Sequence, residues 1–398
     1  MDGMSQPIQG SEYQQTLIDE EEEEQVLDWD VAPSTVVARI ETCTMWLIEK
    51  VSNGELPDLE LPSLFPADQQ KPPQTLSLLG RHVESADRYA RLWSLLNTCH
   101  QNLVSGTTST QRKIQYELKT SSVFGRPSKR NNNDNNNDNG STAQLQVAIQ
   151  DAVRLLRVPR SCLGITCSSK GLVAGAVTIT NTTTGDVLEA LFKPRPIPGN
   201  ILEINELLFD VLPSVEAILL VEKDAVFQSL ATHPALNEDK NIIFITGKGV
   251  PDVATRAFAS QLHLQHPHLL ILGLVDWNPS GVGILALYRY GSRRMVESSR
   301  YTLPTLHWMG VRSGVLGNLS EKEAVRGLQP LTPRDKSLIP GLKAQCAEHE
   351  NDAWVEELSV MEQNGVKADI EAVYRMCEGG AVGFGTMVKY LLHTQQWI

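Results

Sequence analysis

Two acidic residues follow short apolar runs, at the positions where buried strands would end. Glu222 comes directly after residues 217–221, and Asp276 follows residues 269–275, with the polar Asn278 close behind. Because the C-terminal ends of parallel strands converge on one crevice of an open sheet, these groups can meet although they are far apart in sequence. Carboxylates, water and phosphate oxygens are the ligands that Mg²⁺ accepts. The pattern indicates either a magnesium site or acids that merely open the turns after their strands.

A second candidate for chemistry is the phenol of Tyr116. Ser109 or Thr110 can cap a short basic helix that carries Arg112, Lys113 and Tyr116, a pattern typical of a helix presented to DNA. Arg112 lies one helical turn before the tyrosine, where a guanidinium can stabilise a phenolate or a phosphorane oxygen. Many helical tyrosines are half-buried packing residues. Both interpretations, packing contact and nucleophile for transesterification, are open at this point.

Two further lysines lie on turns with neighbouring glycines. Lys170 precedes Gly171, and Lys248 lies between Gly247 and Gly249, where backbone and ammonium can approach a phosphate closely. The alternative is an ordinary turn lysine. The phosphate-binding pattern G-x-x-x-x-G-K-[ST] is absent from the sequence, so no ATP site is visible.

Composition favours an intracellular protein with two compact domains. A chain of 398 residues with 41% hydrophobic residues is too long for one ordinary core and too apolar for global disorder. Six scattered cysteines without a CxxC pair suggest a reducing compartment, and neither a secretory signal nor a membrane span is visible.

Charge is distributed unevenly along the chain. The formal net charge of −12 argues against a nucleic-acid partner at first sight, but ten acids and no basic residue fall within residues 1–30. Residues 105–160 hold nine basic residues against four acids, which makes this segment the best candidate for contact with a polyanion. We interpret residues 1–31 as a disordered acidic tail, since they cannot bury enough apolar surface to offset their ordering entropy.

Apolar spacing predicts helices first, then strands alternating with helices. Helices are expected from Ser34, which can cap the first one, over Ala86–Leu103 and over Ala143–Arg157. The polar run 131–140 is expected to be an exposed loop. A hairpin is expected across residues 169–171, between one strand over Cys162–Thr166 and a second over Leu172–Thr180. Buried strands are then predicted at 217–221, 241–246 and 269–275, with helices at 225–231, 251–264 and 283–290. This alternation favours a parallel or mixed sheet with helices packed on it.

Seven segments, in order, carry a resemblance to one family. They are STQRKIQY (109–116), VPRSCLGITCSSKGLVAG (158–175), LLVEKDAVFQSL (219–230), ITGKGVPDVATRAF (245–258), LVDWNPSGVGIL (274–285), LHWMGVR (306–312) and VKADIEAVY (366–374). Together they resemble the A subunit of topoisomerase VI, and most closely its eukaryotic, fungal relative, the meiotic double-strand-break transesterase. The resemblance implies an α/β protein, α+β overall. Residues 32–157 would form a winged-helix domain of the CAP type. Residues 158–398 would form a Toprim domain with a mixed or parallel sheet flanked by helices, followed by a C-terminal extension.

The resemblance also assigns roles to the candidate residues. The family motif Arg-Asp-Ile-Tyr-Tyr reads RKIQY here, which keeps Tyr116 as the attacking residue and Arg112 as its helper. Glu222 and Asp276 match the Toprim acids that hold Mg²⁺, whereas the third acid is replaced by Asn278. An asparagine keeps a carbonyl oxygen but loses a negative charge, so its attraction for Mg²⁺ is weaker. Lys170 and Lys248 match positions along the DNA channel. Lys113 and Gln115 replace the acid and the first tyrosine of the family motif, and Lys113 is expected to bind DNA because it lies on the basic helix.

The implied activity is formation of meiotic DNA double-strand breaks, with the tyrosine joined to a 5′ phosphate. Implied partners are double-stranded DNA, a second copy of the chain, meiotic accessory proteins and a B-type GHKL ATPase-like subunit. The implied setting is the nucleus, on chromosomes and without a membrane. Two alternatives stay open: a Toprim nuclease that uses water, and a non-catalytic DNA-binding scaffold, which the replacement at Asn278 makes conceivable.

Overall fold

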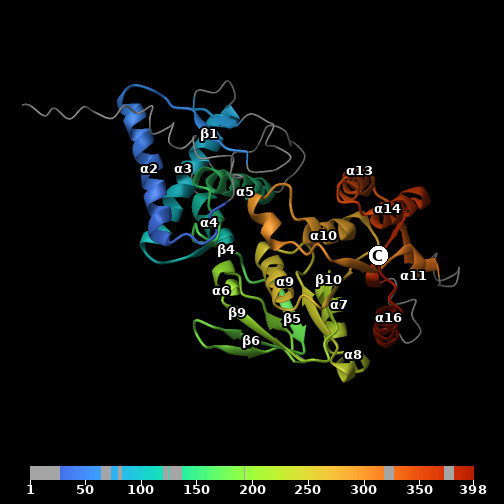
Figure 1. The fold of residues 1–398 in the computed structure, drawn as a ribbon. Helices are drawn as coiled ribbons and strands as arrows, with labels where there is room; N and C mark the ends of the chain where they lie inside the picture. Colours follow the sequence, from blue (N-terminus) through green and yellow to red (C-terminus); the bar gives the residue numbers. More distant parts are fainter. Residues whose placement is uncertain are drawn as a thin grey trace, which may run out of the picture. The chain divides into compact units, whose positions relative to one another are not determined.

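The computed structural model describes residues 27–63, 73–78, 83–119, 124, 137–191, 193–317, 327–371 and 381–398 (Figure 1). The predicted acidic tail lies outside the described residues except for its last five positions, 27–31. The chain divides into two compact units, residues 1–106 with 118–163 and residues 107–117 with 164–398. No helix among the described residues is both long and apolar enough to cross a lipid bilayer.

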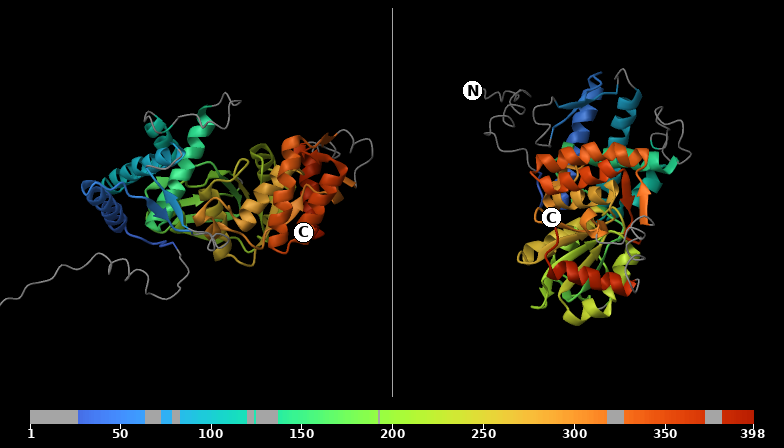
Figure 2. Two further views of the ribbon diagram at one scale, coloured as in Figure 1. Left: turned by 90° about the horizontal axis from the view of Figure 1, so that it is seen from above. Right: turned by 90° about the vertical axis from the view of Figure 1, so that its right-hand side faces the viewer.

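The first unit is built on three helices that pack side by side, α2 (Pro33–Ser52), α3 (Val83–Val104) and α5 (Asn137–Leu156) (Figure 2). Strands β1 (Leu59–Leu61) and β2 (Gln74–Leu76) form a small antiparallel ribbon beside them. The helices meet through periodic apolar side chains that are fully buried, among them Val36, Leu92, Leu96, Ile149 and Val153. All three helices agree with the predicted ones, while the CAP-type winged-helix assignment stays a prediction.

Two helix starts differ from expectation. Helix α2 begins at Pro33 with Ala32 as the N-cap and no side-chain cap, so Ser34 is not the capping residue. Proline suits the first helical turn because its missing N–H would have no partner there. Helix α5 begins at Asn137, so the end of the predicted loop 131–140 is helical, while 131–136 lie outside the described residues. Once a helix is nucleated, each added residue gains a hydrogen bond, which outweighs the poor helix propensity of this polar run.

A six-stranded sheet forms the centre of the second unit, in the order β13-β12-β10-β11-β5-β8. Strands β10 to β13 run parallel to one another, and β5 and β8 add antiparallel pairs on the β11 side. The strands are β5 (Leu172–Gly175), β8 (Arg195–Pro196), β10 (Ala217–Val221), β11 (Ile242–Thr246), β12 (Leu270–Leu274) and β13 (His307–Gly310). The three strands predicted from continuous apolar runs are confirmed, and every residue of β10 and β11 is buried.

Helices and smaller sheets surround this sheet (Figure 1). The helices predicted after the strands are present as α7 (Asp224–Ala231), α9 (Val253–Gln265) and α10 (Pro279–Tyr290). A three-stranded antiparallel sheet has the order β7-β6-β9, and a two-stranded one joins β14 to β15. The remaining elements are β6 (Val177–Asn181), β7 (Val187–Glu189), β9 (Leu207–Val211), β14 (Leu328–Pro330), β15 (Val366–Ala368), α6 (Ile201–Asn205), α8 (Pro234–Asp239), η2 (Val296–Tyr301), α11 (Ser313–Gly317), α13 (Pro333–Glu348), α14 (Asp352–Asn364) and α16 (Ala381–His393).

The predicted hairpin across residues 169–171 is wrong. Strand β4 (Ile165–Thr166) pairs in parallel with β3 (Ser109–Thr110), β5 joins the six-stranded sheet, and β6 joins a different sheet. The chain changes sheets at Gly175, which has a φ of +125° and whose added Cβ would lie 2.5 Å from the Ile242 carbonyl oxygen. A glycine is therefore needed there, and it separates two strands that the apolar pattern alone joins into one.

Candidate active site

The two predicted carboxylates lie together at the C-terminal edge of the parallel strands. Val221 is in register with Leu274 of β12, so both strands end at the same level. Directly beyond them, the Glu222 backbone N–H donates to the Leu274 carbonyl over 3.1 Å. The Glu222 carboxylate then accepts a hydrogen bond from the Asp276 backbone N–H at 2.9 Å. The convergence expected from the strand pattern is present in the structure.

The segment that carries Asp276 is held from two sides. The neighbouring Trp277 exchanges two backbone hydrogen bonds with Ala368 of β15, at 2.9 and 3.0 Å. Its indole N–H donates to the buried Glu357 carboxylate at 2.7 Å. Asp276 itself is 5% exposed, and its Oδ1 accepts from the Ile370 backbone N–H at 2.8 Å. The position of this carboxylate is therefore fixed largely by the chain around β15.

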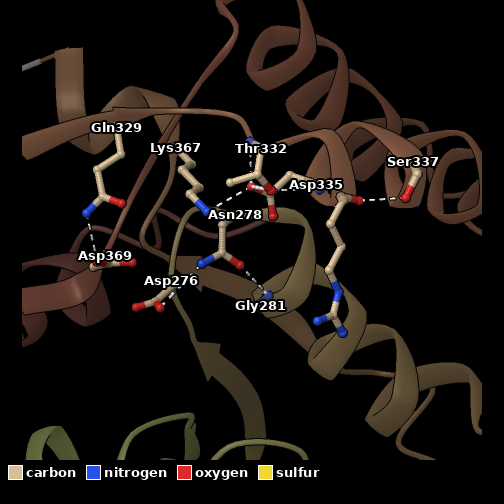
Figure 3. A network of polar contacts seen from close by, with 10 residues as sticks. Asp276, Asn278, Gly281, Gln329, Thr332, Asp335, Ser337, Lys367 and Asp369 are labelled. Carbon is tan, nitrogen blue, oxygen red and sulfur yellow. Dashed lines mark hydrogen bonds and ion pairs between the residues drawn. The ribbon is translucent and has the colours of Figure 1, made fainter. Parts of the chain in front are cut away.

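Asn278 acts as the N-cap of α10. Its Oδ1 accepts from the Gly281 backbone N–H at 2.8 Å, and its Nδ2 lies 3.4 Å from Asp276 Oδ2 as a donor (Figure 3). An aspartate here could accept from Gly281 but could not donate to Asp276. The asparagine thus contacts the acid pair without adding a third negative charge, and its role as a metal ligand stays a prediction.

Lys223 is a cation within this acidic cluster. Its Nζ lies 3.1 Å from Asp276 Oδ1 and also forms an ion pair with Glu371. Burial opposes the charge on Lys223, but its hydrogen bonds and attraction to Glu371 and Asp276 outweigh that effect and raise the pKa of the ammonium. Lys223 is therefore charged over the physiological range.

The carboxylates are destabilised in their ionised form. Burial, followed by the nearby charge of Asp276, raises the pKa of Glu222 to about 7. Burial likewise raises the pKa of Asp276, against the hydrogen bond from Ile370 and the charge of Lys223. A divalent cation bound between the two acids would relieve this repulsion, so the donor set fits the oxygen-ligand chemistry of Mg²⁺. In the described part of the chain no group of three or more His, Cys, Asp or Glu residues is arranged to hold a metal. Mg²⁺ accepts water and phosphate oxygens beside one or two carboxylates.

Tyr116 lies on α4 (Gln111–Lys119), which is anchored by the fully buried Ile114. The side chain of Tyr116 is 58% exposed, so it is no core residue. The Arg112 guanidinium carbon is 6.0 Å from the centre of its ring, the one-turn spacing expected from the sequence. Thr110 accepts a hydrogen bond from the Lys113 backbone N–H at 3.2 Å, which makes Thr110 the cap of this helix.

The three candidate DNA-binding lysines occupy two places. Lys113 is exposed on α4, within 3.7 Å of Glu117. Lys170 donates to the Val250 carbonyl at 2.9 Å, which brings it to the turn that carries Lys248. Lys248 has a φ of +52° and lies 3.5 Å from Asp224. Contact of these three lysines with DNA stays a prediction.

Four side-chain and backbone contributors to this site were not predicted from the sequence: Lys223, Glu357, Ile370 and Glu371. Lys223 directly follows a predicted site acid, and that adjacency was a usable signal. Ile370 and Glu371 fall in the segment VKADIEAVY, which carries the resemblance without indicating a role for either. Nothing in the residue type or spacing of Glu357 marks it as the partner of Trp277.

The parallel sheet with paired acids at its C-terminal edge defines a Toprim domain. The family model for the Toprim domain of Spo11 and of the topoisomerase 6 A subunit matches residues 217–378. The family model "Type IIB DNA topoisomerase" matches residues 87–165.

The chain is 33% identical over 303 residues to the meiotic recombination protein SPO11-2 of Arabidopsis thaliana, covering 75% of this chain and 72% of the relative. It is 30% identical over 298 residues to the meiotic recombination protein SPO11 of Homo sapiens, covering 73% and 68%. It is also 32% identical over 234 residues to the A subunit of DNA topoisomerase 6 from Arabidopsis thaliana, covering 58% and 52%. The chain belongs to the family of topoisomerase VI A subunits and Spo11 proteins.

Proposed function

We propose that the protein forms meiotic DNA double-strand breaks by transesterification. The observation that carries this proposal is the exposed phenol of Tyr116 beside the Arg112 guanidinium, in a chain that also presents the paired acids Glu222 and Asp276. Relatives named as meiotic recombination proteins support the meiotic setting. Action on chromosomes in the nucleus follows from that setting.

In the proposed reaction the Tyr116 oxygen attacks a DNA phosphorus atom. The phenol gives up its proton to solvent as a bond forms between its oxygen and the 5′ phosphate. The bond to the 3′ oxygen breaks, and that oxygen takes up a proton from solvent to leave a 3′ hydroxyl. Arg112 stabilises the phenolate and the charge that develops on the phosphate oxygens. Because the phenol is the nucleophile, the reaction needs no water, and the phosphodiester energy is conserved in the protein–DNA link.

Glu222 and Asp276 would hold Mg²⁺, with Asn278 as a neutral and weaker third ligand or as the holder of a metal-bound water. When bound, the ion supplies stabilisation of negative charge on the reacting phosphate. Lys113, Lys170 and Lys248 would contact the DNA backbone, which positions the duplex without reading its sequence. Residues 32–157, which include α4, would serve as the CAP-type winged-helix domain.

A double-strand break needs two copies of the chain, because one tyrosine cuts one strand. The proposed active unit is therefore a homodimer on double-stranded DNA, in which Tyr116 of one copy acts with the acids of the other. Topoisomerase VI A subunits among the relatives support a partnership with a B-type GHKL ATPase-like subunit, in addition to meiotic accessory proteins. Any ATP hydrolysis would belong to that B-type partner.

The test compares wild type, Tyr116→Phe and Glu222→Gln for covalent protein–DNA adducts, DNA breaks and DNA affinity. Tyr116→Phe removes one exposed oxygen, so the fold and DNA affinity should be retained while adducts and breaks are lost. Breaks that persist in Tyr116→Phe but vanish in Glu222→Gln would indicate a water-using Toprim nuclease instead. Normal recombination in cells that carry Tyr116→Phe, Glu222→Gln and Asp276→Asn together would indicate a non-catalytic scaffold.

A further inference from the structure

Lys223 occupies the space where the acids of the site converge. It follows Glu222 directly, and as the N-cap of α7 it has extended backbone angles, φ −97° and ψ 134°, without a side-chain cap bond of its own. Its ammonium extends to Asp276 on one side and Glu371 on the other, and its side chain is 27% exposed. A single lysine thus bridges carboxylates from two separate segments.

The oxygen that Lys223 contacts has no capacity left for another ligand. Asp276 Oδ1 accepts from the Ile370 N–H at 2.8 Å and lies 3.1 Å from the Lys223 ammonium, which uses both lone pairs of that oxygen. Direct binding of a cation through Oδ1 therefore requires Lys223 to leave. Binding through Oδ2, which has the longer 3.4 Å contact with Asn278, places the cation close to a positive charge.

We infer that Lys223 is a resident counter-cation of the carboxylate site, which neutralises Asp276 and Glu371 when no divalent ion is bound and competes with Mg²⁺ for the site. This inference rests on the proposed role of Glu222 and Asp276 in holding Mg²⁺. Because Asn278 supplies no third charge, the repulsion between Lys223 and the ion is opposed by fewer acids than in a site with three carboxylates.

A purely structural role for Lys223 predicts the opposite effect. If Lys223 were needed to hold Asp276 in place, its removal would weaken Mg²⁺ binding. Asp276 is held independently, however, by the Ile370 N–H and by the backbone pair between Trp277 and Ala368. The carboxylate should therefore keep its position without the lysine.

The test measures Mg²⁺ binding to the full chain without DNA, by calorimetric titration and by the Mg²⁺-induced rise in Tm. Lys223→Met keeps most of the side-chain length and removes the charge, and Lys223→Gln removes the charge but keeps a hydrogen-bond donor. Both should bind Mg²⁺ at least about tenfold more tightly than wild type, or about 1.4 kcal/mol. In metal-free buffer their Tm should be lower, because the acids repel one another without a counter-cation.

Lys389→Met is the matched control. Lys389 is 30% exposed and forms a 2.6 Å ion pair with Asp239, so the substitution removes a similar pair outside the site and should leave Mg²⁺ affinity unchanged. Unchanged or weaker Mg²⁺ binding by folded Lys223→Met or Lys223→Gln would overturn the inference. Glu222→Gln separates this result from the proposed function, because Mg²⁺ binding that survives Glu222→Gln would contradict the metal site itself.

Discussion

The carboxyl group of Glu222 makes the stability of the second unit depend on pH in a predictable direction. Its pKa rises from 4.5 in the unfolded chain to about 7 in the folded chain, mainly through burial. Below pH 4.5 the group is protonated in both states. Between pH 4.5 and 7 the unfolded chain releases the proton and the folded chain retains it, so the free energy of unfolding falls as the pH rises. Above pH 7 the loss is complete.

The magnitude follows from the two pKa values. A difference of one between the two pKa values corresponds to about 1.4 kcal/mol of stability. The increase from 4.5 to about 7 therefore lowers the free energy of unfolding by about 3 kcal/mol. Gln at position 222 keeps an oxygen that can accept from the Asp276 N–H but does not ionise. Relative to wild type, Glu222→Gln should therefore be nearly neutral at pH 4.5 and stabilising by up to about 3 kcal/mol at pH 8.

Urea denaturation in metal-free buffer, at a series of pH values from 4.5 to 8, measures this difference. Because both proteins share every other titrating group, the difference between their two curves reports the titration of Glu222 together with its coupling to Asp276. Added Mg²⁺ should recover the lost stability of wild type at pH 8 and have little effect on Glu222→Gln. Parallel pH profiles for the two proteins would refute the assignment of a raised pKa to Glu222.

Two further substitutions, each compared with a control variant, test how the site is supported. Gly281→Ala places a Cβ 2.4 Å from the Asp276 carbonyl oxygen and 3.2 Å from the Val275 side chain. Urea denaturation should therefore show a free energy of unfolding lower by about 1–3 kcal/mol, and calorimetry should show weaker Mg²⁺ binding. Gly341→Ala, in open space on α13, should instead be neutral or stabilise by up to about 1 kcal/mol; an equal loss in both variants would contradict the steric reasoning. Glu357→Ala removes the hydrogen-bond acceptor of Trp277 and Ser313. The same assay should show a free energy of unfolding lower by about 2–5 kcal/mol, with a smaller loss in Glu357→Gln. Similar losses in the two variants would speak against the hydrogen-bonding role.

The strands of the second unit could be predicted because their signal is local. The runs before Glu222 and Asp276 contain only apolar residues apart from one glycine, and such runs are typical of strands buried on both faces. Parallel topology then requires their C-terminal ends to meet, which is why the pairing of Glu222 with Asp276 followed from the pattern. The one-turn spacing of Arg112 and Tyr116 likewise reflects one short helix, whereas the sequence left the exposure of Tyr116 open.

Contacts between distant segments could not be predicted in this way. The partnership of Lys223 with Glu371 joins residues 148 positions apart, and no property of either residue type specifies it. The hairpin error has a similar origin, since the break at Gly175 depends on the close approach of Ile242 from another strand. In each case the local structure depends on a residue that is distant in sequence and becomes a neighbour only in the folded chain.

The central claim is that Tyr116 becomes covalently linked to DNA, and mass spectrometry of the protein after reaction tests it most directly. The full chain would be incubated with double-stranded DNA, Mg²⁺ and a B-type subunit, then digested with nuclease and protease. The account predicts a peptide that contains Tyr116 with a nucleotide attached through its 5′ phosphate. DNA breaks accompanied by no tyrosine-linked nucleotide, or by a link at another residue, would contradict it.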